Sequence, residues 1–189
     1  MFLLFLFIFF NKFLYKLRIF FFIKCIAMVK YKLFLLILFS MSAGKIVSQV
    51  PAQILPDFEF CRLNKSPFTN NDLPKEKMLF FVFFDSDCEH CQHAIKNIDQ
   101  QYNSFKKASI YLISTDDNDK INRFINTYGK RLKNQKNVVL LRDNLHQFIA
   151  KFKPLKYPSM FLYSTEKKLI GYEDNEESVF RFFKPISGK

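Results

Sequence analysis

The chain of 189 residues is long enough for one ordinary domain and a leader, and it carries a formal net charge of +12. The positive charge gives little support to nucleic-acid binding, because half of it lies in the leader. The first 43 residues hold six of the 29 basic residues and no acidic one, which leaves 23 basic against 17 acidic residues and a net charge of +6. The four glycines form no phosphate-binding loop, which argues against a nucleotide cofactor.

Residues 1–27 consist almost wholly of Phe, Leu, Ile, Lys, Asn and Tyr, without Gly, Pro, Asp or Glu. The apolar blocks Met1–Phe10 and Ile19–Ile23 are far shorter than the roughly 20 apolar residues that a bilayer span needs. This composition is typical of translated AT-rich noncoding sequence, which predicts a natural start at Met28. The alternative is a membrane-associated leader that includes Cys25 and tethers the protein.

Residues 28–43 have the three parts of a secretory signal peptide: basic Lys30 and Lys32, an uncharged stretch from Leu33 to Met41, and small residues around Ala43. This pattern predicts export to the periplasm or cell envelope, with a mature chain that begins near Ala43. The expected organisation is a leader at 1–27, a signal peptide at 28–43, a linker at 44–53 and one domain at 54–189.

Strand patterns and one long helix are expected in the first half of that domain. Phe58–Leu63 and a short return at Phe68 form an expected hairpin. The wholly apolar Met78–Phe84 is expected as a buried strand at the centre of the sheet. Apolar residues from Ala94 to Phe105 recur with helical spacing, which predicts one helix of about five turns.

The second half continues the alternation of strands and helices, which indicates an α/β fold with helices on both faces of a central sheet. The sheet is expected to be mixed because the last two strands can pair as a hairpin. The expected elements are a strand at Ser109–Ser114, a helix capped within Thr115–Asp119 with apolar positions from Ile121 to Leu132, a strand at Val138–Leu141, a short helix from Leu145 to Phe152, strands at Ser159–Tyr163 and Lys168–Tyr172, and a final helix at Glu176–Phe183.

The sequence Cys88-Glu89-His90-Cys91 follows the apolar strand directly and opens a helix. Cysteines at this spacing share one helical face, and the free N–H groups and positive dipole end of a first turn stabilise a thiolate. The pattern predicts a redox-active dithiol that needs no cofactor besides its own disulfide.

A structural zinc site is the other interpretation of paired cysteines, and it requires four ligands. Cys25 and Cys61 are single and His93 adds at most a third ligand, so no metal is predicted. Haem attachment requires His directly after the second cysteine, where the chain has Gln92. Cys61 is expected to be a buried small hydrophobic residue, and no role is expected for His93 or His146.

Four segments carry a family likeness: ILPDFEF, FFVFF before the dithiol, NVVLLRDNLHQFIAKF, and Tyr157-Pro158-Ser159 before a strand. With them, the chain from about Ile54 to Phe183 resembles the thioredoxin-like superfamily, in particular exported redoxin or TlpA-like thiol-disulfide oxidoreductases and their AhpC/TSA relatives. The resemblance implies a thioredoxin-like fold with an N-terminal hairpin and an inserted strand and helix. It also implies that Pro158 is a cis proline that lies against the dithiol.

On this interpretation Cys88 attacks a substrate disulfide and Cys91 resolves the mixed disulfide. Protonated His90 favours the Cys88 thiolate, whereas Asp87 and Glu89 oppose it, because like charge disfavours a thiolate. The alternative for His90 is an exposed residue without a special role. The expected partners are protein thiols or disulfides and an upstream redox partner, with no nucleic acid.

The sequence also departs from the family pattern. Val82 stands where thioredoxin carries a buried acid, so the proton of the second cysteine must move to another group or to water. A thiol peroxidase is one alternative function, although Asp85, Ser86 and Asp87 replace the peroxiredoxin pattern ahead of Cys88. The other alternative is a non-catalytic binding module with a structural disulfide. Reductant, oxidant and isomerase stay open as directions of exchange.

Overall fold

The computed structural model describes residues 24, 28, 30–34 and 49–188. The chain divides into two units, Met1–Ser48 and Gln49–Lys189. In the first unit residues 30–34 are helical and exposed, and the leader and signal-peptide predictions otherwise lie outside the described residues. Within the described part of the chain, no helix is both long and apolar enough to cross a bilayer.

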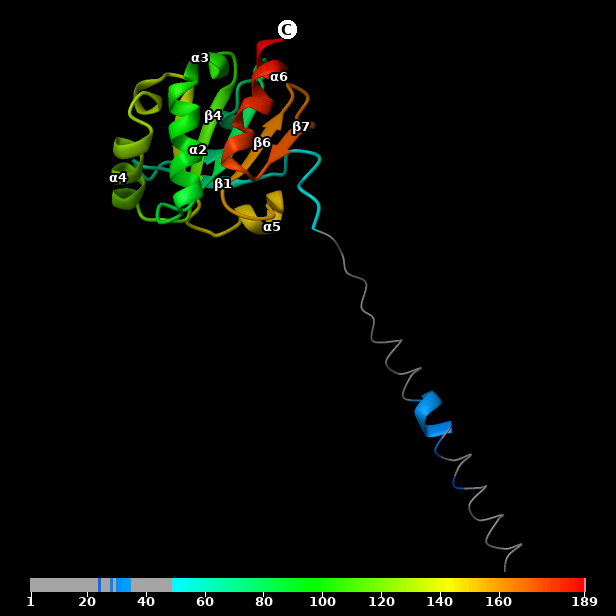
Figure 1. Ribbon diagram of the computed structural model, residues 1–189. Coiled ribbons are helices and arrows are strands. Elements are labelled where there is room, and N and C mark those ends of the chain that lie inside the picture. The colour runs from blue at the N-terminus through cyan, green and yellow to red at the C-terminus, as the bar shows by residue number, and fades with distance from the viewer. Residues whose placement is uncertain (1–23, 25–27, 29, 35–48, 189) are drawn as a thin grey trace, which may run out of the picture. The chain divides into compact units, whose positions relative to one another are not determined.

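The second unit is built on a seven-stranded mixed sheet (Figure 1). Its strands are β1 Glu59–Arg62, β2 Pro67–Thr69, β3 Leu79–Phe83, β4 Ser109–Ser114, β5 Val138–Arg142, β6 Ser159–Tyr163 and β7 Leu169–Glu173. They lie in the order β2-β1-β5-β4-β3-β6-β7. β4 pairs in parallel with β3 and β5, and the remaining pairs are antiparallel. The predicted mixed sheet, N-terminal hairpin and inserted strand are confirmed.

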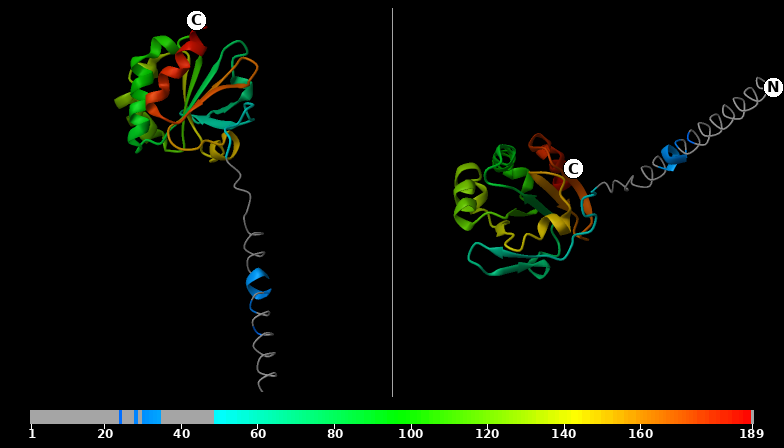
Figure 2. Two further views of the ribbon diagram at one scale, coloured as in Figure 1. Left: turned by 45° about the vertical axis from the view of Figure 1, so that its right-hand side comes forward. Right: turned by 90° about the horizontal axis from the view of Figure 1, so that it is seen from below.

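Helices cover both faces of this sheet. They are α2 Glu89–Gln100, α3 Tyr102–Phe105, α4 Asn118–Tyr128, α5 Phe148–Phe152 and α6 Phe183–Ser187, with the 3-10 helices η1 Asn70–Asp72, η2 Leu132–Asn134 and η3 Glu176–Phe182. One face packs against α2, α3, α4, η3 and α6, and the other packs against α5 and side chains of the β1–β2 hairpin. Figure 2 shows α2 and the C-terminal helix on the same side of the sheet.

Strand β3 ends shortly before the dithiol motif. All five of its residues are buried, because Phe80 and Val82 face one core while Phe81 and Phe83 face the other. It lies between β4 and β6, so the middle position of the sheet belongs to β4 rather than to β3. The continuous apolar run therefore reports burial on both faces and not the position of the strand within the sheet.

The predicted five-turn helix is wrong, because it is interrupted at Gln101. This residue has φ −96° and ψ 19°, outside the helical range, so α2 ends and the separate short helix α3 begins. Tyr102 and Phe105 are buried after the break. The apolar spacing continues across the break, which is why periodicity did not locate it.

Three other helix boundaries differ from the predictions. α4 ends at Tyr128, where Gly129 is the C-cap residue, and Leu132 belongs to η2. Leu145 precedes α5 and is exposed. The final helix is a 3-10 helix followed by α6, so its tighter turn changes which side chains share a face.

Candidate functional site

The two cysteines of the motif lie where β3 gives way to α2. Phe84 ends the extended run by donating its N–H to the carbonyl of Ile113 at 3.0 Å. Cys88 is the N-cap residue of α2 and is half-buried, whereas Cys91 lies in the first turn and is fully buried. Both are free thiols. The structure thus combines an accessible thiol at a helix start with a covered thiol one turn further.

The environment of Cys91 opposes its ionisation. Burial raises the pKa of the Cys91 thiol well above its ordinary value. A hydrogen bond with the Asp85 backbone lowers this pKa, while the neighbouring Cys88 and the Asp85 carboxylate raise it. Cys91 is therefore protonated at neutral pH, and it must lose a proton before it can act as a nucleophile.

Asp85 is a site residue that sequence reasoning missed. Its carbonyl accepts the N–H of Cys88 at 3.3 Å, and its Oδ1 accepts the N–H of Asp87 at 2.8 Å. Its carboxylate acts electrostatically on both Cys91 and Tyr157. The Asp85 carboxylate thus stands near the buried thiol, although Val82 leaves the strand itself without an acid. The sequence signal that could have identified Asp85 is its place directly after the strand.

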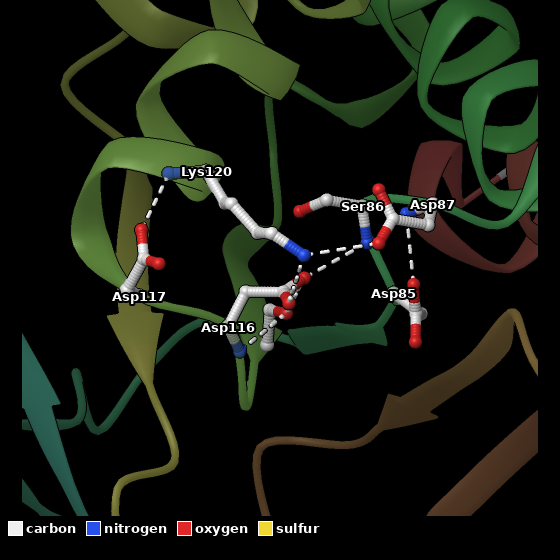
Figure 3. Close-up of polar contacts among 7 residues, drawn as sticks. Asp85, Ser86, Asp87, Asp116, Asp117 and Lys120 are labelled. Atoms are coloured by element: carbon white, nitrogen blue, oxygen red, sulfur yellow. Dashed lines mark hydrogen bonds and ion pairs between the residues drawn. The ribbon is translucent and has the colours of Figure 1, made fainter.

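The turn before Cys88 is bound to the start of α4 by a polar network (Figure 3). The N–H of Ser86 donates to Oδ2 of Asp116 at 2.9 Å, and the hydroxyl of Ser114 donates to the same oxygen at 3.0 Å. Nζ of Lys120 lies 3.0 Å from Oδ2 of Asp87 and 3.9 Å from Oδ1 of Asp116. Sequence reasoning did not find this connection.

The acidic run after β4 has two roles. Asp117 caps α4 as predicted, because its Oδ1 accepts the N–H of Lys120 at 2.8 Å. Burial raises the pKa of Asp116, but hydrogen bonds from Ser86 and Ser114 and the lysine charge lower it more. The pKa of Asp116 therefore lies below its ordinary value, and the carboxylate is charged at neutral pH.

His90 is paired away from the dithiol motif. Its Nδ1 lies 2.7 Å from Oε1 of Glu176 in η3, and the imidazole is 69% exposed. Burial raises the pKa of Glu176, but the hydrogen bond with His90 and the charges of His90 and His93 lower it more. The imidazole of His90 therefore already has a carboxylate as its partner, which weakens the predicted influence of His90 on Cys88.

Tyr157, in the loop before β6, packs against the same hydrophobic core as Cys88. The Tyr157–Pro158 peptide bond is cis, as the resemblance implied, and Pro158 is buried. The Tyr157 ring packs against Phe83 with centroids 4.9 Å apart and the ring planes tilted by 31°, and it interacts electrostatically with Cys91. Burial, followed by nearby negative charge, raises the pKa of Tyr157 to about 12.

A surface hollow of about 350 Å³ adjoins this loop. Its walls include His90 of the dithiol motif, Lys156 and Tyr157 of the loop, and Glu176 of η3. The hollow is therefore bordered by both the motif and the loop.

The remaining candidate residues lie apart from this arrangement. Cys61 pairs with Arg142 across β1 and β5 and is half-buried, which corrects the prediction of a buried position. The strand is near the edge of the sheet and leaves this side chain partly uncovered. His93 and His146 are exposed. Among the described residues, no group of three or more His, Cys, Asp or Glu is placed to hold a metal ion.

Comparisons with known proteins agree with this architecture. A model of the AhpC/TSA family matches residues 51–171. No curated protein matches the chain. The thioredoxin domain of a thiol-disulfide oxidoreductase from Bacteroides vulgatus is 22% identical, with a TM-score of 0.58 over 73% of this chain and 98% of that one.

Two further solved structures have the same fold. A secreted disulfide oxidoreductase from Mycobacterium tuberculosis, homologous to DsbE of E. coli, is 18% identical, with a TM-score of 0.56 over 70% of this chain and 96% of that one. The peroxidoxin BcpB from the same organism is 16% identical, with a TM-score of 0.59 over 74% of this chain and 96% of that one. At these identities the likeness establishes a thioredoxin-like fold.

Proposed function

The chain belongs to the AhpC/TSA family, and from this premise we propose that it exchanges disulfides with protein substrates through Cys88 and Cys91. One observation carries the proposal: a half-buried thiol at the N-cap of α2 stands one turn from a fully buried thiol. An accessible nucleophile and a protected resolving thiol are the two parts that such exchange requires. The secretory pattern of residues 28–43 supports substrates among exported proteins, whose disulfides persist.

The reaction proceeds through two exchanges of sulfur. The Cys88 thiolate attacks one sulfur of the substrate disulfide, and the other substrate sulfur leaves as a thiolate that takes up a proton. Cys91 then loses its proton and attacks the Cys88 sulfur of the mixed disulfide. The Cys88–Cys91 disulfide forms and the second substrate thiol is released. Two electrons have passed to the substrate, and a partner dithiol of the same chemistry restores the protein.

We propose that Asp85 accepts the proton that Cys91 loses. The thiol is fully buried, so bulk water does not reach it directly. The Asp85 carboxylate lies within charge range of the thiol, and its backbone is hydrogen-bonded to the same sulfur. A carboxylate in this position accepts the proton as Cys91 attacks.

Asp85→Asn is expected to slow the resolution of the mixed disulfide by about 10²-fold, the lower end of the usual effect of a general base. The amide oxygen retains the acceptor for the Asp87 N–H, so the turn keeps its shape. Rapid mixing of reduced protein with a disulfide peptide, acid quenching and mass spectrometry measure the decay of the mixed disulfide. Glu89→Gln, which removes an exposed acid from the same motif, should leave that decay unchanged. Equal decay in Asp85→Asn and the unaltered protein would remove Asp85 from this role.

Exchange with glutathione tests the function itself. The oxidised protein is expected to equilibrate with glutathione buffers, with a potential inside the range of roughly −120 to −270 mV covered by redox-active pairs of this type. A structural disulfide has a potential below about −300 mV and resists the same buffers. Peroxide consumption is measured in parallel. Faster turnover with hydrogen peroxide than with a disulfide peptide would replace the proposal by thiol peroxidase activity.

A further inference from the structure

We propose that Lys120 is a positioning residue for the dithiol: it ties the start of α4 to the turn before Cys88 and offsets the negative charge of Asp87 there. The inference rests on the proposed function, because it concerns the reactivity of the same thiol. Its consequence is that a residue 32 positions after Cys88 contributes to the balance between dithiol and disulfide.

The Lys120 side chain contacts two carboxylates at the turn. Nζ of Lys120 lies 3.0 Å from Oδ2 of Asp87, the residue directly before Cys88. It also lies 3.9 Å from Oδ1 of Asp116, whose Oδ2 accepts the N–H of Ser86 at 2.9 Å. Figure 3 shows the lysine reaching from the first turn of α4 across to this turn.

The backbone of Lys120 is itself fixed, because its N–H donates to Asp117 at 2.8 Å. The side chain therefore starts from a capped helix turn rather than from a loop. The hydrogen bond with Asp87 and the charges of Asp87 and Asp116 raise the pKa of Lys120, so it is charged throughout the neutral range.

The charges around the turn are mostly negative. The ionisable groups on the turn and on the elements next to it are Asp85 and Asp87 on the turn, Glu89 and His90 on α2, Asp116, Asp117, Lys120 and Arg123 at α4, and Tyr157 in the loop before β6. Asp143 after β5 acts on Tyr157, and Glu176 in η3 pairs with His90. A carboxylate beside a thiol disfavours the thiolate, and a cation beside it favours the thiolate. Without Lys120, the charge of Asp87 next to Cys88 is not offset.

The expected effect of removing the Lys120 charge is moderate because the ion pair is exposed to solvent. The Lys120 side chain is 39% exposed and that of Asp87 is 78% exposed, so solvent and salt screen the charges. A change of about threefold in reactivity is the expected size, and it should shrink as the salt concentration rises.

Lys120→Met tests the proposal, because it retains an unbranched apolar stem and removes the charge. We expect alkylation of Cys88 by iodoacetamide at pH 7 to slow and its pH profile to move to higher pH. The equilibrium with glutathione should shift toward the disulfide. The two factors together amount to about threefold, so the shift in potential is at most about 14 mV. Lys120→Arg should restore both values, and circular dichroism confirms the fold of each variant.

Two further variants separate charge compensation from a structural effect. Asp87→Asn removes the charge that Lys120 offsets and the ion pair that holds the lysine at the turn, so Lys120→Met should have a smaller effect in that background. Lys96→Met removes an exposed positive charge from α2 about 12 Å along the helix from Cys88, and it should change neither value. Unchanged alkylation and potential in Lys120→Met, or an equal loss in the Asp87→Asn background, would overturn the inference.

These measurements use iodoacetamide and glutathione without a protein substrate. If the shifts are found but no protein disulfide is exchanged, the inference about Lys120 holds and the proposed function fails. If exchange is found without the shifts, the proposed function holds and the inference fails.

Discussion

Cys88→Ser is expected to abolish disulfide exchange, with a loss of about 10³-fold or more. A serine hydroxyl does not form a disulfide and is almost wholly protonated at neutral pH, so no mixed disulfide with the substrate can form. Reduction of a fluorescent disulfide peptide, with the protein regenerated by dithiothreitol, measures the loss.

The position of Cys88 makes this result interpretable. The Cys88 side chain makes no capping hydrogen bond at the start of α2, and serine is among the residues favoured at an N-cap. The variant should therefore be at least as stable as the unaltered protein, and a loss of exchange reports chemistry rather than unfolding.

Cys61→Ser provides the matched control. Cys61 is also a free, half-buried cysteine, but it lies in β1 and pairs with Arg142 of β5. The same chemical change there should leave exchange intact. Full activity of Cys88→Ser together with loss of activity in Cys61→Ser would show that the nucleophile is wrongly assigned.

The parts of the site that the sequence predicted are contiguous in the chain. The apolar strand, the two cysteines and the helix that begins there occupy one continuous segment, so period and spacing were sufficient to predict them. Pro158 is distant in sequence, and the expectation of a cis proline against the dithiol came from the family resemblance rather than from the pattern itself.

The parts that were missed depend on how the strands are arranged. β3 and β4 are parallel neighbours, so the turns that follow them emerge at the same edge of the sheet. This brings Asp116 and Lys120 against the turn that contains Ser86 and Asp87. Each group alone reads as an ordinary helix cap or an exposed charge, and only the pairing of the two strands joins them.

The same limit explains the pairing of His90. Its place between the cysteines suggested an effect on Cys88, but Glu176 lies 86 positions further along and binds the imidazole in the folded chain. Local sequence identifies which groups can carry charge near the dithiol. Tertiary structure decides which of those charges are already balanced.

Cys91→Ser is expected to accumulate a covalent adduct with the substrate, with near-stoichiometric mixed disulfide where the unaltered protein shows almost none. Cys88 retains its accessible thiol and still attacks, but the serine hydroxyl does not displace the substrate sulfur from it. Intact mass spectrometry after mixing with a disulfide peptide, followed by an acid quench, measures the adduct.

The burial of Cys91 requires a second variant. Its side chain is fully buried in the core beside Ile95 and Ile98, so a serine hydroxyl there costs about 1–3 kcal/mol unless it is hydrogen-bonded. Cys91→Ala leaves no polar group to satisfy and removes the resolving sulfur equally, so both variants should trap the same adduct.

The buried Cys91 thiol resolves the mixed disulfide but does not attack the substrate. A Cys88→Ser protein should therefore show no adduct on Cys91. Equal adduct on either cysteine would reverse or merge the two roles, and absence of adduct in all three variants would favour a binding module with a structural disulfide.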